Sequence, residues 1–415
     1  MRHHRTRGPM TDQLTAAAAG VGLEPSFQQV VSLPDGAVVG YEALARWPGM
    51  DGLGPLEVFA HAKRTCQLDA LDRHCIHSAA RGALDGAWRP GMLLLINCEP
   101  TTSNIDMEVT SALATAASAF DVVFEFTERG LLTNPRALLG KVASLRAHGF
   151  KIAMDDLGAH SDSLALLDII QPEFLKLDLN LVQRQPDRVQ ARTIAGVIAH
   201  HERTGAVIVA EGIETEEHLE QALAYGATLG QGYRFGRPGA LTHAPDAFIG
   251  PSHASIVPLA DDASTFALVR DRLRPRTVRF DTLHELSRHI ERLATTAESP
   301  PMVLATVQDQ SKLSDATMRT YTKLARRAPL VAMFGANVPD DLGNGLRGVH
   351  LAASDPLVHE WTILVLGPDI AAGLIAREVS PPGTPQADRR FDMVITFDRS
   401  LVTLGARCLL SRLAA

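Results

Sequence analysis

The chain has 415 residues, 46% of them hydrophobic, and a formal net charge of −7. Two domains are expected at this length, and the acidic balance excludes a global basic field that would recruit nucleic-acid polymers. No apolar stretch approaches the roughly 20 residues that span a bilayer, and the four cysteines form no CxxC pair. A reduced, cytoplasmic protein without a membrane partner is therefore expected.

Residues 1–20 predict a disordered leader, because no apolar segment of a secretion signal follows the basic start MRHHRTRGPM. Eight strand-like segments come next, most of them rich in Val, Ile, Leu and Phe without strict alternation, as in strands buried on both faces. They are 26–33, 37–47, 92–97, 121–127, 151–155, 173–178, 206–211 and a short segment near 227–231. The turn signal PDG (34–36) predicts that the first two segments form an antiparallel hairpin.

Segments with helical spacing separate these strands. They cover 56–84, as one or two helices, and then 134–149, 188–205 and 215–226. Gly149, Gly205 and Gly226 are placed to end the last three, and Thr215 is placed to cap the start of the last. This alternation predicts an α/β fold, here a TIM-like (β/α)8 barrel with one antiparallel strand, over residues 21–245.

The composition changes at 239–262, where Gly, Pro, Ser and Ala dominate without periodicity. We place a linker at 246–262, and residues 263–413 then predict a second, smaller α/β domain. Its strands are expected near 278–280, 302–307, 329–335, 348–352, 361–367 and 393–397, and its helices near 281–297, 314–327, 368–377 and 399–413.

Six apolar runs of the barrel segment each end in a polar residue that can bind a metal or handle a proton. These residues are Glu42, Asn97, Glu125, the pair Asp155 and Asp156, Lys176, and Glu211. One acidic residue after a strand is common, because loops are polar. A series separated by helix-length segments indicates strand ends that meet at one site on the rim of a barrel.

This series is made of oxygen ligands and contains no histidine or cysteine, which favours Mg²⁺ or Mn²⁺ over Zn²⁺. Five converging carboxylates would repel one another, and two divalent cations would neutralise most of that charge. Two such cations suit in-line attack of water on a phosphodiester. Lys176 is then the non-metal cation that positions the water or stabilises charge at phosphorus.

Over about 220 residues the chain resembles the EAL-domain cyclic-di-GMP phosphodiesterases. The motifs that carry the resemblance stand in the family's order: GYEALARW (40–47), INCEP (96–100), EFTE (125–128), MDDLG (154–158), LKLD (175–178), AEGIE (210–214) and QGYRFGRP (231–238). The resemblance implies hydrolysis of cyclic di-GMP to linear pGpG with two Mg²⁺ or Mn²⁺ ions, and a homodimer.

The resemblance also assigns roles residue by residue. The metals would be bound by Glu42, Asn97, Glu125, Asp155, Asp156 and Glu211. Lys176 would contact the nucleophilic water and, with Glu42, Asp155, Asp156 and Glu211, carry the catalysis. Substrate contacts would come from Gln28, Leu44, Arg46, Gln231 and Phe235. A place for Phe235 in the barrel core is an equal alternative to base stacking, and Glu128 would brace the paired-aspartate loop.

The loop at 157–163 departs from the family pattern. Leu157 stands in place of the family's aromatic residue, and His160 stands where glycine is usual and restricts the backbone. Both aspartates remain, so metal binding is expected. The altered loop supports an alternative, a receptor that binds cyclic di-GMP without turnover and signals through the C-terminal domain. A barrel that acts on another phosphodiester is disfavoured by Gln28, Arg46 and the QGYRF segment.

The C-terminal part resembles the DICT sensory domain over two segments, HEWTILVLGPDIAAGLIARE (359–378) and RRFDMVITFDRSLVTLGARCLL (389–410). The resemblance implies that this part senses a ligand or binds a protein partner and so regulates the barrel. The residues themselves do not specify the ligand.

Overall fold

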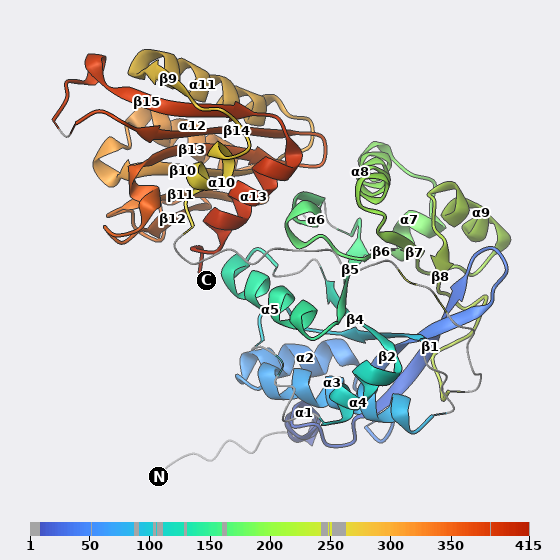
Figure 1. Cartoon of the computed structure of the whole chain (residues 1–415). Helices are drawn as coiled ribbons and strands as arrows, with labels where there is room; N and C mark the ends of the chain where they lie inside the picture. The colour runs from blue at the N-terminus through green and yellow to red at the C-terminus, as the bar shows by residue number, and fades with distance from the viewer. Residues whose placement is uncertain are drawn as a thin grey trace, which may run out of the picture. The chain divides into compact units, whose positions relative to one another are not determined.

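The computed structural model describes residues 9–50, 52–86, 91–102, 105, 111–127, 131–159, 164–241, 248, 250, 263–381 and 383–414. They form two compact units, coloured along the chain in Figure 1. The first takes in the described residues of Met1–Leu131, Gly140–Ser161 and Pro172–Ser255, and the second those of Leu132–Leu139, Asp162–Gln171 and Ile256–Ala415. Residues 251–262 lie outside the described residues, so the predicted boundaries of the barrel, linker and second domain stay predictions.

In the described part of the first unit, eight strands close a barrel (Figure 1). The strands are β1 (Glu24–Ser32), β2 (Val38–Arg46), β3 (Leu93–Asn97), β4 (Asp121–Thr127), β5 (Lys151–Leu157), β6 (Phe174–Leu177), β7 (Val207–Ala210) and β8 (Leu229–Gly230). β1 runs antiparallel to β2 and to β8, and the other neighbours are parallel. The predicted TIM-like barrel with one reversed strand is confirmed.

Helices alternate with the strands in sequence. They are α2 (Pro55–Arg64), α3 (Leu68–Leu84), α4 (Ser111–Ala119), α5 (Pro135–Ala147), α6 (Leu164–Ile170), α7 (Leu179–Gln183), α8 (Arg188–Thr204) and α9 (Glu216–Ala224). Gly205 ends α8 with a φ of +74°, a left-handed conformation that suits glycine. The Thr215 hydroxyl accepts the His218 N–H at the start of α9, as predicted.

The expectation of a disordered leader is wrong for residues 9–18, which form helix α1 (Pro9–Ala18). Ala17 and Ala18 are fully buried in a cluster with Trp47 and Val58. The alanine-rich stretch therefore supplies a small apolar face for packing, rather than a solvated tail. Residues 1–8 lie outside the described residues.

The second unit is built on a seven-stranded sheet of described residues in the order β12-β11-β10-β13-β14-β15-β9. The strands are β9 (Arg276–Arg279), β10 (Met302–Asp309), β11 (Val331–Ala336), β12 (Leu346–His350), β13 (Glu360–Leu366), β14 (Ala371–Glu378) and β15 (Arg390–Thr396). β10, β11 and β12 are parallel and the other pairs antiparallel.

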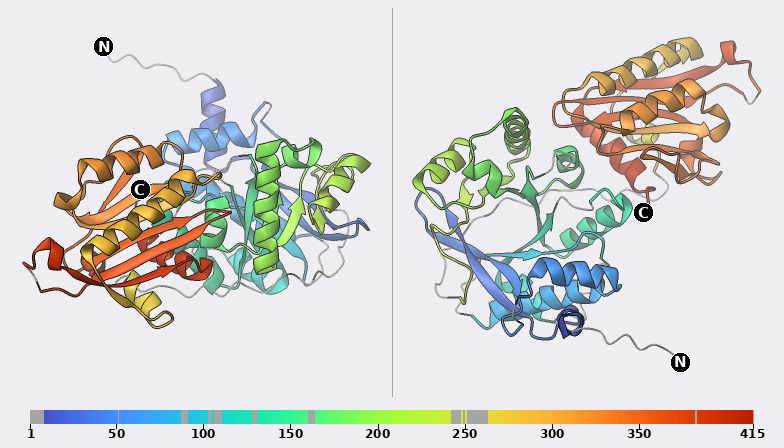
Figure 2. Two further views of the ribbon diagram at one scale, coloured as in Figure 1. Left: turned by 90° about the horizontal axis from the view of Figure 1, so that it is seen from above. Right: turned by 180° about the vertical axis from the view of Figure 1, so that it is seen from behind.

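Helices cover both faces of this sheet (Figures 1 and 2). They are α10 (Thr265–Arg270), α11 (Phe280–Thr296), α12 (Asp315–Ala325) and α13 (Arg399–Leu410). α11 and α12 pack on the face that carries Ile363 and Val365. α13 packs on the opposite face, where a Cβ at Gly405 would lie only 3.0 Å from Leu364. None of the described helices in either unit is long and apolar enough to cross a membrane.

The helix expected near 368–377 is wrong, because most of this segment is strand β14. The run AAGLIA has the small and apolar residues of a helix. In the fold, however, β14 lies between β13 and β15 and pairs with both. Gly373 fits this interior position, since a Cβ there would lie 3.1 Å from Leu364 and 3.4 Å from Val402. The burial of β14 between two strands, with helices on both faces of the sheet, therefore outweighs the helix propensity of its residues.

Glu360, at the start of β13, is a buried carboxylate that ties α10 to the sheet. Only 1% of its surface is exposed. The Phe266 N–H donates to it at 3.3 Å, and the hydroxyls of Ser264 and Thr265 also donate to it. Burial raises the pKa of Glu360 above its ordinary value.

This raised pKa predicts that the second unit loses stability as the pH rises. A carboxyl whose pKa is higher in the folded state contributes stability that is complete below its unfolded pKa and is lost as pH rises through the folded pKa. We expect Glu360→Gln to flatten the fall in melting temperature between acidic and neutral pH, measured by calorimetry. Glu285→Gln, at an exposed position, is the control, and parallel curves for wild type and Glu360→Gln would contradict the prediction.

Candidate active site

The polar site lies one layer above the apolar core of the barrel, on the same strands. Leu95, Val123, Ala153, Phe174, Val209 and Leu229 belong to the buried cluster that includes strand residues of the barrel. Two residues further along the chain come Asn97, Glu125, Asp155 and Lys176, which lie on their strands, and Glu211 and Gln231, which directly follow β7 and β8. Because side chains two residues apart on a strand share a face, the second set extends the first toward the carboxyl ends of the strands.

Lys176 is the centre of this polar layer and is completely buried. Its Nζ lies within ion-pair distance of four carboxylates: Glu211 at 2.7 Å, Glu125 at 2.8 Å, Asp155 at 3.0 Å and Glu42 at 3.4 Å. Burial alone would lower the pKa of Lys176, but the surrounding carboxylates raise it well above its ordinary value. One lysine charge thus faces four acids, which leaves the site short of positive charge.

Two amides orient Glu42 within the layer. Asn97 Nδ2 donates to Glu42 Oε1 at 2.9 Å, and Gln231 Nε2 donates to Glu42 Oε2 at 3.1 Å. Burial opposes ionisation of Glu42, but Lys176 and these two amides together hold its pKa below the ordinary value. Glu42 is therefore fixed as a carboxylate, and the amide of Asn97 is fixed with its nitrogen toward Glu42.

The remaining acids fit divalent cations. One oxygen from each of Asp155, Asp156 and Glu211 lies within 4.8 Å of the other two. Both carboxylate oxygens of Glu125 are buried, and the Lys176 Nζ that lies 2.8 Å from Oε1 is shared with three other carboxylates. Burial raises the pKa of Glu125 well above its ordinary value and that of Glu211 to about 8. Buried oxygens with too few donors and too little positive charge are the environment that hard cations such as Mg²⁺ and Mn²⁺ fill.

Asp156 lies near the end of β5, where the pairing with β6 is irregular between Met154 and Leu157. Its φ is +57°, in the left-handed region where aspartate is better tolerated than most residues. Gly158 follows with a φ of +102°, and a Cβ there would lie 2.4 Å from Leu181 Cδ1, so only glycine fits. The chain therefore keeps the glycine that this turn needs. His160 and the rest of 160–163 lie outside the described residues.

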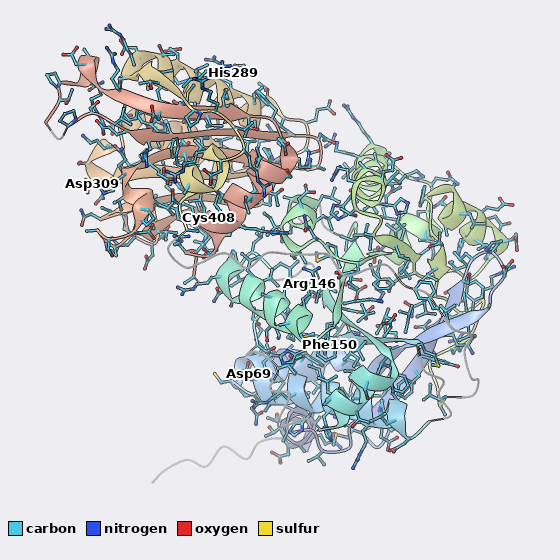
Figure 3. The ribbon with its side chains drawn as sticks, viewed as in Figure 1. Asp69, Arg146, Phe150, His289, Asp309 and Cys408 are labelled. Atoms are coloured by element: carbon cyan, nitrogen blue, oxygen red, sulfur yellow. The ribbon has the colours of Figure 1, made fainter. Side chains whose placement is uncertain are left out.

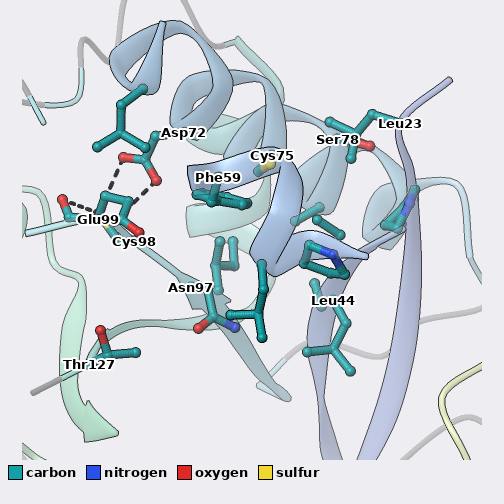
Figure 4. Close-up of a pocket in the computed structure, with 18 of the residues that line it drawn as sticks. Leu23, Leu44, Phe59, Asp72, Cys75, Ser78, Asn97, Cys98, Glu99 and Thr127 are labelled. Atoms are coloured by element: carbon teal, nitrogen blue, oxygen red, sulfur yellow. Dashed lines mark hydrogen bonds between the residues drawn. The ribbon is translucent and has the colours of Figure 1, made fainter. Parts of the chain in front are cut away.

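A groove of about 590 Å³ opens from the acids (Figure 4). At one end it is lined by Glu42, Asn97, Asp155 and Asp156. Leu44 and Arg46 also line it, because they follow Glu42 at intervals of two on β2 and share its face. The far wall comes from α2 and α3 and from the turn after β3, and includes Phe59, Lys63, Asp72, Cys75 and Glu99.

Residues 11–238, over half of the chain, match the EAL domain. The chain therefore belongs to the EAL-domain family. Residues 264–379 match the DICT domain, a sensory domain in diguanylate cyclases and two-component systems. Both assignments agree with the resemblances expected from the motifs.

Several curated relatives of this EAL domain are cyclic di-GMP phosphodiesterases by name. The chain is 33% identical to RocR of Pseudomonas aeruginosa over 225 residues, covering 52% of this chain and 57% of RocR. It is 31% identical to NbdA of the same species over 240 residues, covering 55% of this chain and 30% of NbdA. The match thus spans little more than half of one relative and under a third of the other.

Solved structures also match the EAL domain. Klebsiella pneumoniae BlrP1, in a complex with calcium and cyclic di-GMP, is 28% identical and has a TM-score of 0.44. The match covers 53% of this chain and 57% of that one.

Two of the predicted substrate-binding residues, Gln28 and Phe235, lie on or beside the β1–β2 hairpin. Gln28 on β1 is the direct partner of Glu42 on β2, so the two side chains share a face. The ring of Phe235 lies 3.8 Å from the place a Cβ would take at Gly36, in the turn between β1 and β2. Neither lines the groove, and their substrate contacts stay predictions. Glu128 lies outside the described residues.

Sequence reasoning missed the far wall of the groove. Phe59 and Lys63 are on α2, directly after the strand that carries Glu42, and that position was the available signal. Glu99 stands two residues after Asn97, inside the INCEP segment. Burial and the nearby Asp72 raise the pKa of Glu99. Glu99 is therefore a partly buried acid of the groove wall and is not fully solvated.

Proposed function

We propose that the EAL domain hydrolyses cyclic di-GMP to linear pGpG with two divalent cations, Mg²⁺ or Mn²⁺. The observation that carries the proposal is the buried set of oxygen ligands around one lysine. The proposed metal ligands are Glu42, Asn97, Glu125, Asp155, Asp156 and Glu211. The names of relatives such as RocR and NbdA support the choice of substrate.

The residues of the site divide the work of the reaction. When bound, the two cations would supply an activated water and stabilise the charge on the phosphodiester oxygens. Lys176, fixed by carboxylates on several sides, holds the attacking water by donating to it and remains protonated. Arg46 at the groove wall donates to the phosphate. The water oxygen bonds to phosphorus and gives up a proton, the bond from phosphorus to the 3′ oxygen breaks, that oxygen takes up a proton to become a hydroxyl, and the ring opens to pGpG.

The second candidate is a receptor that binds cyclic di-GMP without turnover and signals through the DICT domain. The altered 157–163 loop favours it, since Leu157 replaces the expected aromatic residue. Against it stands the full ligand set, which a receptor has no need to keep. We therefore rank the phosphodiesterase first.

One assay separates the two candidates. The purified full chain is incubated with cyclic di-GMP and Mn²⁺ or Mg²⁺, with EDTA as the control, and pGpG is measured by chromatography. We expect metal-dependent pGpG. Tight binding of intact cyclic di-GMP in metal-containing buffer, with no pGpG, would establish the receptor instead.

Regulation belongs to the proposal as well. We propose that a small ligand or a protein partner at the DICT domain changes turnover by the EAL domain, in a cytoplasmic homodimer. Comparing residues 1–245 with the full chain gives the sign of regulation, and light scattering gives the oligomeric state. Identical kcat and KM in the two proteins would argue against regulation by this domain.

A further inference from the structure

The loop at residues 98–102 (the 98–102 loop), directly after Asn97, is held by two buried side chains from outside it. Lys141 on α5 donates its Nζ to the Glu99 carbonyl at 2.7 Å and to Thr102 Oγ1 at 2.5 Å. Asp72 on α3 accepts the Glu99 N–H at 3.1 Å and the Thr102 hydroxyl at 2.6 Å. Figure 4 shows Asp72 beside Glu99 and Cys98. Both the N–H and the carbonyl of Glu99 are thus bonded to these side chains.

Stabilisation of the barrel does not by itself explain why Asp72 and Lys141 are buried as an ion pair. The side chains of Lys141 and Asp72 are 1% and 4% exposed, and their Nζ and Oδ2 atoms lie 3.7 Å apart. Taking two charges out of water is expensive, and a well-packed apolar pair of similar volume is often as stable or more stable. Burial raises the pKa of Asp72 even though Lys141 lies beside it.

The direction of the bonds indicates what the pair does. Within the described residues, every hydrogen bond that the Asp72 side chain accepts or the Lys141 side chain donates has its partner in the 98–102 loop. The loop is also tied to β4, because the Cys98 N–H donates to the Glu125 carbonyl at 2.9 Å. The pair therefore fixes the backbone that leaves the last residue of β3, and that residue is Asn97.

We propose that Asp72 and Lys141 are positioning residues that fix the 98–102 loop and so hold Asn97 where it can bind a divalent cation. The inference rests on the proposed metal-binding role of Asn97. A neutral amide has no charge to draw it toward a cation, so its place must be set by the surrounding structure. Groups that orient metal ligands in this way contribute strongly to metal affinity.

The first test replaces the pair with apolar side chains in the full chain, as Asp72→Leu with Lys141→Met. Mn²⁺ affinity is measured by calorimetry and the exposure of the 98–102 loop by hydrogen exchange. We expect Mn²⁺ affinity to fall about 10- to 100-fold, the range for loss of partners behind metal ligands. Exchange in the 98–102 loop should become faster.

A milder pair of variants keeps the test decisive if the double variant does not fold. Thr102→Val keeps the shape of the side chain and removes the hydroxyl that joins Asp72 to Lys141. Thr102→Ser keeps the hydroxyl. We expect Thr102→Val to weaken Mn²⁺ binding and loosen the 98–102 loop, and Thr102→Ser to restore both toward wild type.

The matched control is a second buried ion pair that also begins on α5. Arg146, labelled in Figure 3, lies 3.1 Å from Glu173, and their side chains are 8% and 2% exposed. Glu173 also accepts a backbone N–H from Ile152, near the start of β5 and away from the acids. Arg146→Met with Glu173→Leu should therefore change stability and leave Mn²⁺ affinity as in wild type.

Three results decide the matter. Wild-type Mn²⁺ affinity and exchange in Thr102→Val would overturn the proposal, as would an equal loss of affinity in the Arg146 and Glu173 control. Asn97→Ala tests separately whether Asn97 is a metal ligand, on which the positioning role of Asp72 and Lys141 depends. If Asn97→Ala binds Mn²⁺ as wild type does, the ligand role fails; if only Asn97→Ala weakens binding, the positioning role alone fails.

Discussion

Replacing Asp155 with asparagine should abolish hydrolysis of cyclic di-GMP while the barrel stays folded. Asp155 Oδ1 is buried and lies 3.0 Å from Lys176 Nζ, and one oxygen of each of two other proposed ligands, Asp156 and Glu211, lies within 4.8 Å of an oxygen of Asp155. Asparagine keeps the volume and removes the charge, so the loss falls on metal binding. Since partners behind a metal ligand are worth about 10- to 100-fold, we expect the loss of a ligand itself to exceed roughly 100-fold in kcat/KM.

The control for this prediction is an aspartate at the other end of the barrel. Asp121 begins β4 and pairs with Lys151 at 2.7 Å, far along the strand from the acids. Asp121→Asn removes the same charge from a partly exposed pair, which contributes little to stability. Turnover is measured as pGpG formed at saturating Mn²⁺, and the fold by circular dichroism. Wild-type turnover in Asp155→Asn would break the metal assignment.

Much of the site could be predicted because the strands repeat one simple pattern. On β3, β4 and β7 an apolar side chain inside the barrel is followed two residues later by a polar one, as in Leu95 and Asn97 or Val209 and Glu211. That spacing is visible in the sequence, and strand direction brings the polar ends together. Gln28 is different, because only the register of the antiparallel pair places it opposite Glu42.

The residues that support the site could not be found in this way. Asp72 and Lys141 are single charged residues in helical segments, where a solvated face is the ordinary expectation. Their burial depends on how α3 and α5 meet the loop after β3, which no local pattern records. The strand β14 shows the same limit: its alanine-rich segment favours a helix, and only the neighbouring strands β13 and β15 make it a strand.

Lys176→Met should make the protein depend on divalent cations for its stability. The lysine is the positive charge that Glu42, Glu125, Asp155 and Glu211 share in the described site. Removing one partner of a buried ion pair costs about 3–5 kcal/mol. For a domain of this size that corresponds to a fall of roughly 10 °C in melting temperature in EDTA. Protonation of the acids would relieve their repulsion, so the fall should grow as the pH rises.

Added Mn²⁺ should then raise the melting temperature more in Lys176→Met than in wild type, because the cations supply the charge that the lysine no longer gives. Turnover should stay low, because the group proposed to hold the attacking water is gone. Lys151→Met, which removes a lysine from the pair with Asp121, should show the wild-type response to Mn²⁺. Equal Mn²⁺-induced shifts in Lys176→Met and wild type would mean that the acids around Lys176 do not bind the metal. Stability restored by Mn²⁺ without turnover would instead assign Lys176 to the chemistry and the acids to the metals.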